Sequence, residues 1–174
     1  MNFRQQIAKY VTGNLTKSQL PSVGMIGLEE GFDSPSLRIL AGLGESESSF
    51  VIDYYFDFSL KELNITLPDR RQAAIDYAMA FVDEILCKNI DVIEGTKEIL
   101  QKAINSYDFF SESEKYCYDS IGFETAYGLY DLFNELSDND YPLRVEENLD
   151  LKIETRDSLL AELKRWVDKL KNCA

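Results

Sequence analysis

The stretch DRRQAAIDYAMAFVDEILC, residues 69–87, decides the fold class. Asp69 and Gln72 form a capping box, in which each side chain can bond the backbone N–H of the other residue and so begin a helix. Apolar residues then recur at helical spacing over a wide arc. They are Ala74, Ile75, Tyr77, Ala78, Met79, Phe81, Val82, Ile85 and Leu86. A helix that is apolar over so much of its circumference is expected at the centre of a core.

Helix signals of the same kind continue on both sides of this stretch. Capping boxes at 91–94 and 111–114 indicate two further helix starts. Predicted helices cover residues 3–11, 20–30, 35–41, 69–87, 91–105 and 123–136, a short piece after 111, and the chain from about 155 onward. Short connections between them favour antiparallel neighbours. The sequence therefore predicts an all-α protein, a multihelical bundle or small helical array of about six to eight helices, as a single domain over 1–174.

Two segments are harder to assign. Residues 50–63 alternate apolar and polar side chains, which is the period of a strand, but the segment is long for a strand and has no obvious strand to pair with. We therefore expect a helix there. Residues 137–154 are polar and predict a long surface loop, in which Leu149, Leu151 and Ile153 allow one short extended piece.

The most distinctive motif is GFDSPSLRILAGL at residues 31–43. Its first glycine suits the left-handed end of one helix, and Ser34 and Pro35 supply the cap and the first position of the next. The motif resembles the pattern G-x-D-S-P-x-L-R-x-L-A-G-L of small bacterial all-helical proteins without an assigned activity. That resemblance implies a helical fold and a bacterial origin, and no mechanism. We expect a structural role for the motif; Asp33 and Arg38 are its only charged residues.

The charge balance is one-sided, with 31 acidic and 18 basic residues and a formal net charge of −13. Residues 1–40 are near neutral, whereas 41–100 and 101–174 each carry a net charge of −7. Such a field repels nucleic acid and anionic lipid and attracts basic proteins and cations. The alternative is that the acidity serves solubility alone.

Several kinds of chemistry are missing from the sequence. There is no histidine, which removes imidazole bases, His-containing triads and His-ligated metals, so the sequence leans away from an enzyme. The three cysteines are spaced for neither a zinc cluster nor a redox motif. No cofactor motif, secretory signal or membrane-spanning run is recognisable, so we expect no cofactor and no membrane partner, and a cytoplasmic location.

Tyrosines beside acidic residues are the best functional hint, since tyrosine is favoured at interfaces and an acidic rim selects basic partners. If residues 50–63 are helical, Asp53 and Asp57 form a like-charged pair that a cation or a basic side chain would relieve. The candidate partner-binding residues are Asp53, Tyr54, Asp57, Tyr118, Asp119, Tyr130 and Asp131.

The leading hypothesis is an acidic intracellular module that docks a basic protein, as immunity proteins and inhibitors do. The first alternative is a carboxylate-based divalent-metal protein or enzyme that uses Asp76, Asp83 and Glu84 on one helix. The second is a structural, self-assembling protein whose C-terminal helix, which contains Trp166, packs on a second copy of itself.

Overall fold

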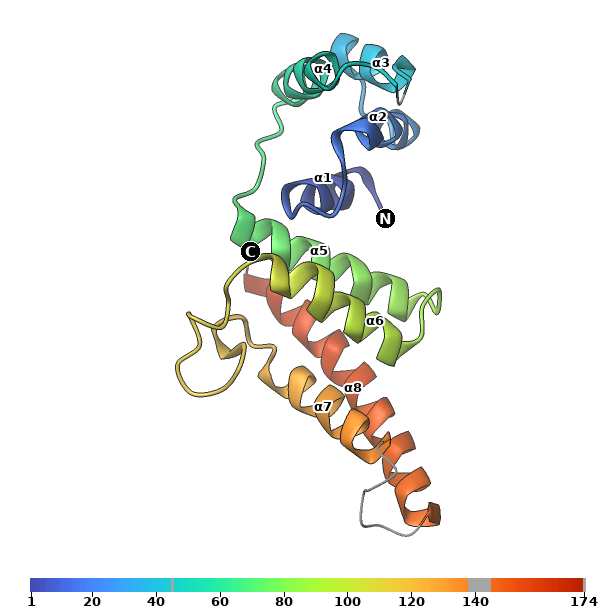
Figure 1. Ribbon diagram of the computed structural model, residues 1–174, viewed down its shortest axis with the longest axis vertical. Coiled ribbons are helices and arrows are strands. Elements are labelled where there is room, and N and C mark those ends of the chain that lie inside the picture. The colour runs from blue at the N-terminus through green and yellow to red at the C-terminus, as the bar shows by residue number, and fades with distance from the viewer. Residues whose placement is uncertain (45, 138–144, 174) are drawn as a thin grey trace. The chain divides into compact units, whose positions relative to one another are not determined.

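The computed structural model describes residues 1–44, 46–137 and 145–173 (Figure 1). Within these residues the chain forms eight α-helices and no strand, so the predicted all-α fold is confirmed. The chain divides into two compact units, Met1–Ala80 and Phe81–Ala174. Helix α5 (Arg70–Leu86) begins in the first unit and ends in the second. Its predicted apolar arc is buried except at Met79, which is half-buried, and at Leu86, which is exposed.

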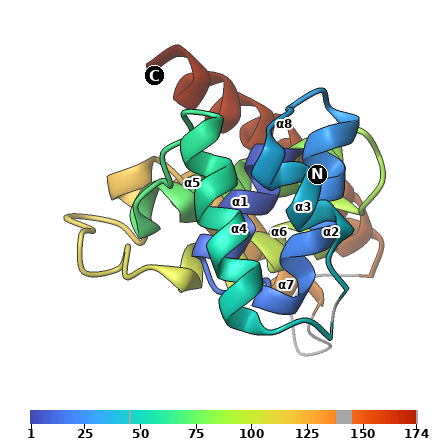
Figure 2. The same ribbon diagram turned by 90° about the horizontal axis from the view of Figure 1, so that it is seen from above.

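The first unit contains α1 to α4 and the start of α5. Helix α1 is Phe3–Val11, α2 is Leu20–Glu29 after a 3₁₀ turn at Lys17–Gln19, α3 is Pro35–Gly42 and α4 is Ser49–Glu62. Helices α2, α3 and α4 pack on one another, and α1 packs on α2 (Figure 2). The core that they share consists of Phe3, Ile7, Leu15, Leu20, Val23, Leu37, Leu40, Ile52, Phe56 and Leu60.

The 31–43 motif forms the α2–α3 connection. Gly31 has φ +88°, a left-handed conformation that glycine adopts with little strain because it has no side chain. It lies just after the end of α2. The Ser34 hydroxyl accepts the backbone N–H of Leu37 at 3.2 Å, and Leu37 and Leu40 are fully buried. Asp33 and Arg38 form an exposed ion pair with each other. These contacts explain the motif: its first residues end α2, and Ser34 caps the start of α3.

Residues 50–62 are helical and Leu63 is the C-cap, so the expected helix is confirmed and the period of two in this segment does not indicate a strand. The period arises because aromatic side chains occupy both sides of α4. One side is buried at helical spacing through Ile52, Phe56, Ser59 and Leu60. The other side carries aromatic residues that remain in contact with solvent.

The second unit contains the end of α5 and the helices that follow it. Helix α6 is Val92–Glu98 and continues through a π turn at Ile99–Ala103 and a 3₁₀ turn at Ile104–Ser106. After a loop and a short 3₁₀ turn at Asp119–Ile121 come α7, Glu124–Ser137, and α8, Val145–Cys173. Helices α7 and α8 pack side by side (Figure 1). Trp166 of α8 donates its indole N–H to the Ile121 carbonyl at 2.8 Å and meets the Phe123 ring edge-on.

The predicted surface loop at 137–154 is wrong at Ser137, where α7 ends, and from Val145 onward, where α8 begins. Residues 138–144 of that prediction lie outside the described residues. The optional extended piece at 149–153 is also helical. The helix forms because Thr155, Leu159 and Leu163 bury one continuous face at intervals of four, while Leu149 and Ile153 remain on the outside.

The predicted helix after Ser111 does not form. Ser111 bonds back to Asp108 through both its backbone N–H and its hydroxyl, instead of capping the residues that follow. Side-chain bonds of this kind stabilise turns at the expense of helix. Residues 107–118 are therefore a loop.

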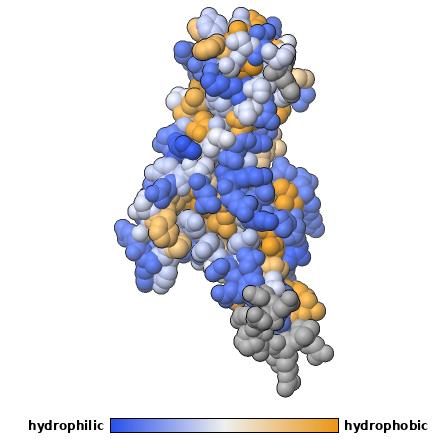
Figure 3. Space-filling view, in the orientation of Figure 1, coloured by the Kyte–Doolittle hydropathy of each residue, from blue (hydrophilic) through white to orange (hydrophobic). Residues whose placement is uncertain are grey.

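Among the described helices none has a stretch both long enough and apolar enough to cross a bilayer. Figure 3 shows that hydrophilic side chains cover much of the visible face, with hydrophobic side chains interspersed among them.

Candidate interaction surface on helix α4

The outer face of α4 carries three aromatic side chains in consecutive turns. Phe50 is 84% exposed, Tyr54 55% and Phe58 40%. The Tyr54 and Phe58 rings lie 4.5 Å apart between centroids at an interplanar angle of 35°. The ammonium of Lys61 lies 5.0 Å from the Phe58 centroid, and Asp57 is exposed on the same face. We call Phe50, Tyr54, Asp57, Phe58 and Lys61 the α4 outer face.

The two aspartates that the sequence pairs have different surroundings. Asp53 lies at the edge of the face and forms an ion pair with Lys17 from the 3₁₀ turn before α2. Its charge also contributes to the raised pKa of Tyr10, for which burial is the larger cause. Lys17 of the same chain is thus the cation that relieves the repulsion between Asp53 and Asp57. Asp57 remains directed outward with the aromatic residues.

Hydrogen bonds from α3 hold the C-terminal end of α4 in place. The Glu62 carboxylate accepts the backbone N–H of Ser36 at 2.9 Å and its hydroxyl at 2.8 Å. These bonds lower the pKa of Glu62, and the bond from the Ser36 backbone has the largest effect. The helix is also fixed by its buried side, where Ile52 is fully buried and Phe56 meets the Tyr10 ring edge-on at 5.2 Å. The outer face is therefore presented on a rigid element.

Tyr118 and Asp119, the second predicted pair, organise their own loop. The Asp119 carboxylate accepts the backbone N–H groups of Glu114, Lys115 and Tyr116 at 3.0, 2.7 and 3.0 Å. These bonds, the one from Tyr116 first, lower the pKa of Asp119. Tyr118 has φ +64° and packs edge-on against Tyr127. The carboxylate oxygens are occupied within the loop, so this pair offers little to a partner.

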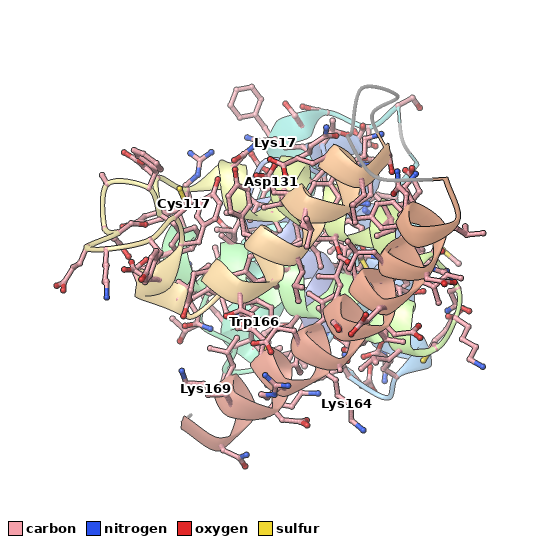
Figure 4. The ribbon with its side chains drawn as sticks, turned by 90° about the horizontal axis from the view of Figure 1, so that it is seen from below. Lys17, Cys117, Asp131, Lys164, Trp166 and Lys169 are labelled. Atoms are coloured by element: carbon pink, nitrogen blue, oxygen red, sulfur yellow. The ribbon has the colours of Figure 1, made fainter. Side chains whose placement is uncertain are left out.

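Tyr130 and Asp131 lie on α7 in the second unit. Tyr130 is half-buried, and Asp131 is exposed. Figure 4 shows Asp131 on α7 and Cys117 in the preceding loop. The charge of Asp131 adds to the effect of burial in raising the pKa of Tyr127. No group of exposed aromatic residues accompanies this pair within the described part of α7, because its aromatic residues are half-buried.

The carboxylates of the metal alternative each have a partner of their own. Asp76 accepts the Gln72 amide at 2.8 Å, and burial raises its pKa. Asp83 lies 3.8 Å from the ammonium of Lys171, and Glu84 accepts the Asn89 amide at 2.8 Å. The described residues bring no three acidic or cysteine side chains together in a way that suits a metal ion.

The sequence reasoning named Tyr54 and Asp57 and missed Phe50, Phe58 and Lys61 as members of the same face. The signal was present, because these residues recur every three or four positions once the buried side is assigned. It was hidden by the alternation of apolar and polar residues, which has the period of a strand and not that of a helix face.

Comparisons of the chain with known proteins assign it to no family. No family model matches the chain, and neither the curated proteins nor the solved structures contain a match.

Proposed function

We propose that this protein is a binding module that docks a basic protein partner on the α4 outer face. The observation that carries the proposal is the exposure of Phe50, Tyr54 and Phe58 in three consecutive turns, beside the outward carboxylate of Asp57. Contiguous exposed aromatic surface of this kind marks interaction sites, whereas a single exposed ring needs no explanation.

The chemistry of the face favours arginine on the partner. A guanidinium group stacks on aromatic rings and at the same time pairs with a carboxylate in a planar arrangement. Lys61 already places its ammonium over Phe58, so the rings accept a cation from this side. Asp57, one position before Phe58, supplies the carboxylate. An arginine-bearing segment is therefore the expected contact.

The size of the face fits a modest interface. An aromatic side chain buries about 150–250 Å² when it is covered completely, and Tyr54 and Phe58 are already partly covered by the chain. The three rings therefore supply part of the roughly 800 Å² that a standard interface buries on one partner. The net charge of −13 adds attraction at longer range, which raises the association rate at low salt.

A direct test uses two synthetic peptides that differ only in having arginine or lysine at the same positions, titrated into the ¹⁵N-labelled protein. We expect shift changes centred on residues 50–61 with the arginine peptide, and weaker ones with the lysine peptide. Phe50→Ala with Tyr54→Ala should weaken the arginine peptide about tenfold or more, as loss of interface anchors does.

The matched control is Asp168→Asn, which removes one exposed carboxylate from α8 in the other unit. It should leave peptide binding nearly unchanged, whereas Asp57→Asn should weaken it. If both variants weaken peptide binding equally, or if the shift changes spread over all acidic surfaces, the proposal is contradicted. The acidic residues would then attract the peptide only through the overall negative charge. Concentration-dependent dimerisation through the same residues would instead identify a second copy as the occupant and contradict the proposal.

A further inference from the structure

A second exposed surface lies on the N-terminal half of α8. Leu149 is 59% exposed, Ile153 54% and Leu160 37%. They are spaced by four and seven residues, so they form one ridge along the helix, on a different face from the buried Thr155 and Leu159. Hydrophobic side chains are visible at this part of α8 in Figure 3. We call the three residues the α8 ridge.

The ridge meets a cleft at its C-terminal end. The cleft has a volume of about 530 Å³, and Leu160 belongs both to it and to the ridge. The apolar part of the cleft is lined by Ile85, Ile90, Val92 and Leu160, and its charged part by Lys88, Asp91, Arg156 and Asp157. Arg156 lies at the cleft and is held there by its ion pair with Asp91, whose other carboxylate oxygen accepts the Ile93 N–H at 2.9 Å. A hollow with an apolar part and a fixed charged part can take one large side chain from a partner on its apolar part.

Acidic side chains follow the ridge along one flank. Asp150, Glu154 and Asp157 are exposed at intervals of four and three residues, and together with Ile153 they line a shallow hollow beside it. The second unit carries 21 acidic and 11 basic residues, a net charge of −10, so the wider field has the same sign. An apolar stripe with carboxylates along one flank is complementary to an amphipathic helix with basic residues along its matching flank.

We infer that the α8 ridge and its cleft bind a basic amphipathic helix of a partner protein, with one large apolar side chain of that helix seated in the cleft. The ridge extends over the 12 residues from Leu149 to Leu160, or about 16 Å, so three turns of the partner helix cover it. This surface shares no residue with the α4 outer face, and the inference does not depend on the function proposed above.

The probe for the test is an 18-residue synthetic helix with leucine on one face and lysine along one flank, labelled for fluorescence anisotropy. Its control is a peptide of identical composition and charge whose order destroys the apolar face. We expect the amphipathic peptide to bind at least about tenfold more tightly than the scrambled one, because only the former can place its apolar residues on the ridge.

Substitutions on the ridge and on its acidic flank should weaken binding separately. Ile153→Ser with Leu160→Ser should lower the affinity about tenfold or more, because both side chains contact the apolar face. The flank variant Asp150→Asn, Glu154→Gln, Asp157→Asn should lower the affinity and reduce its salt dependence. The control, Asp131→Asn, Glu135→Gln, Asp168→Asn, removes the same number of exposed carboxylates from other faces of the second unit and should have little effect.

Three outcomes would overturn the inference. They are equal binding of the scrambled peptide, equal loss in the flank and control variants, and dimerisation of the protein that Ile153→Ser abolishes. Circular dichroism of each variant checks that α8 remains folded. The double variant Phe50→Ala, Tyr54→Ala should leave the affinity for this peptide unchanged. Loss of binding at the α8 ridge can therefore be distinguished from loss of binding at the α4 outer face.

Discussion

The two units differ in how they use their charged and apolar residues. The first, residues 1–80, has 10 acidic and 7 basic side chains and presents the aromatic α4 outer face. The second, residues 81–174, has a net charge of −10. Three of its exposed large apolar residues follow α8 beside carboxylates, and the others are Leu86, Phe110 and Tyr116. Net acidity is therefore concentrated in the second unit, whereas the row of exposed aromatic residues in consecutive turns of one helix lies in the first. A net charge calculated over the whole chain does not locate an interaction surface.

The acidic residues of the second unit also have internal roles. Asp119 holds the loop before α7, Asp91 caps α6 and positions Arg156, and Asp83 pairs with Lys171. In the first unit Asp53 and Asp33 are likewise paired, with Lys17 and Arg38. The comparison shows that the acids to examine for partner binding are those that remain outward, such as Asp57 and Asp157.

The largest effect is expected from removing one core aromatic ring in each unit. Phe56 in the first unit and Phe123 in the second are both almost fully buried. Phe56→Ala and Phe123→Ala should each lower the free energy of unfolding by about 3–5 kcal/mol, since a buried ring is lost and a cavity remains. Urea unfolding followed by far-ultraviolet circular dichroism measures both. A loss below 1 kcal/mol in either variant would show that the corresponding core is packed less tightly than described.

Two helical glycines of the second unit, Gly95 and Gly128, allow the effect of close packing on stability to be distinguished from that of helix propensity. A Cβ on Gly95 of α6 would lie 2.4 Å from Cγ1 of Ile85, whereas one on Gly128 of α7 would meet nothing within 4 Å. Gly95→Ala should destabilise the protein by about 1–3 kcal/mol through overpacking. Gly128→Ala should stabilise it by about 0.5–1 kcal/mol. The two melting temperatures provide the comparison, and shifts in the same direction would contradict it.

A smaller effect distinguishes the two roles of Asp91. Asp91→Asn keeps a capping oxygen for the N–H of Ile93 but removes the charge that holds Arg156. Asp91→Ala removes both and should cost about 0.5–2 kcal/mol, whereas the asparagine variant should cost only a fraction of that. Equal losses in thermal unfolding would mean that the ion pair, and not the cap, is the main contribution.

The smallest global effect is expected at Asp119. Its pKa is lowered by the backbone N–H groups of residues 114–116, so its contribution to loop stability is present above the ordinary aspartate pKa and is lost as the pH falls through the lower folded value. The amide signals of 114–116 should titrate together with the Asp119 carboxyl carbon in an NMR pH series. Asp119→Asn should abolish this shared titration while α7 and α8 stay folded. A midpoint at or above the ordinary value would contradict the bonding described.

Local signals in the sequence were sufficient for most of the fold. The apolar arc of α5, the Ser34 cap and the stop at Gly31 act through neighbours in the chain, so their positions follow from spacing and side-chain chemistry. The start of α8 depends instead on a distant face, because Thr155 and Leu159 bury the helix whose first turns are polar. The prediction of α8 therefore failed because its stabilising contacts are not local, whereas the predicted helix after Ser111 failed because the local bonds of Ser111 to Asp108 favour a turn.

The candidate site followed from the sequence only in part. Tyr54 and Asp57 are on the α4 outer face as a tyrosine–acid pair suggests, but Asp119 and Tyr118 look equivalent in the sequence and serve the loop. Exposure decides between these roles, and exposure depends on which side of each helix is buried. The α8 ridge went unrecognised for the same reason, since Leu149 and Ile153 stood in a presumed loop.

The position of Trp166 gives the second unit an optical label of its own. It is the only tryptophan in the chain, it is 2% exposed, and its indole N–H is held by the Ile121 carbonyl. Its emission should therefore be that of a ring shielded from water, and it should shift toward longer wavelength when α8 leaves Ile121. Selective excitation of tryptophan would thus follow one unit of the native sequence, without an added dye or an engineered residue, while circular dichroism follows the whole chain.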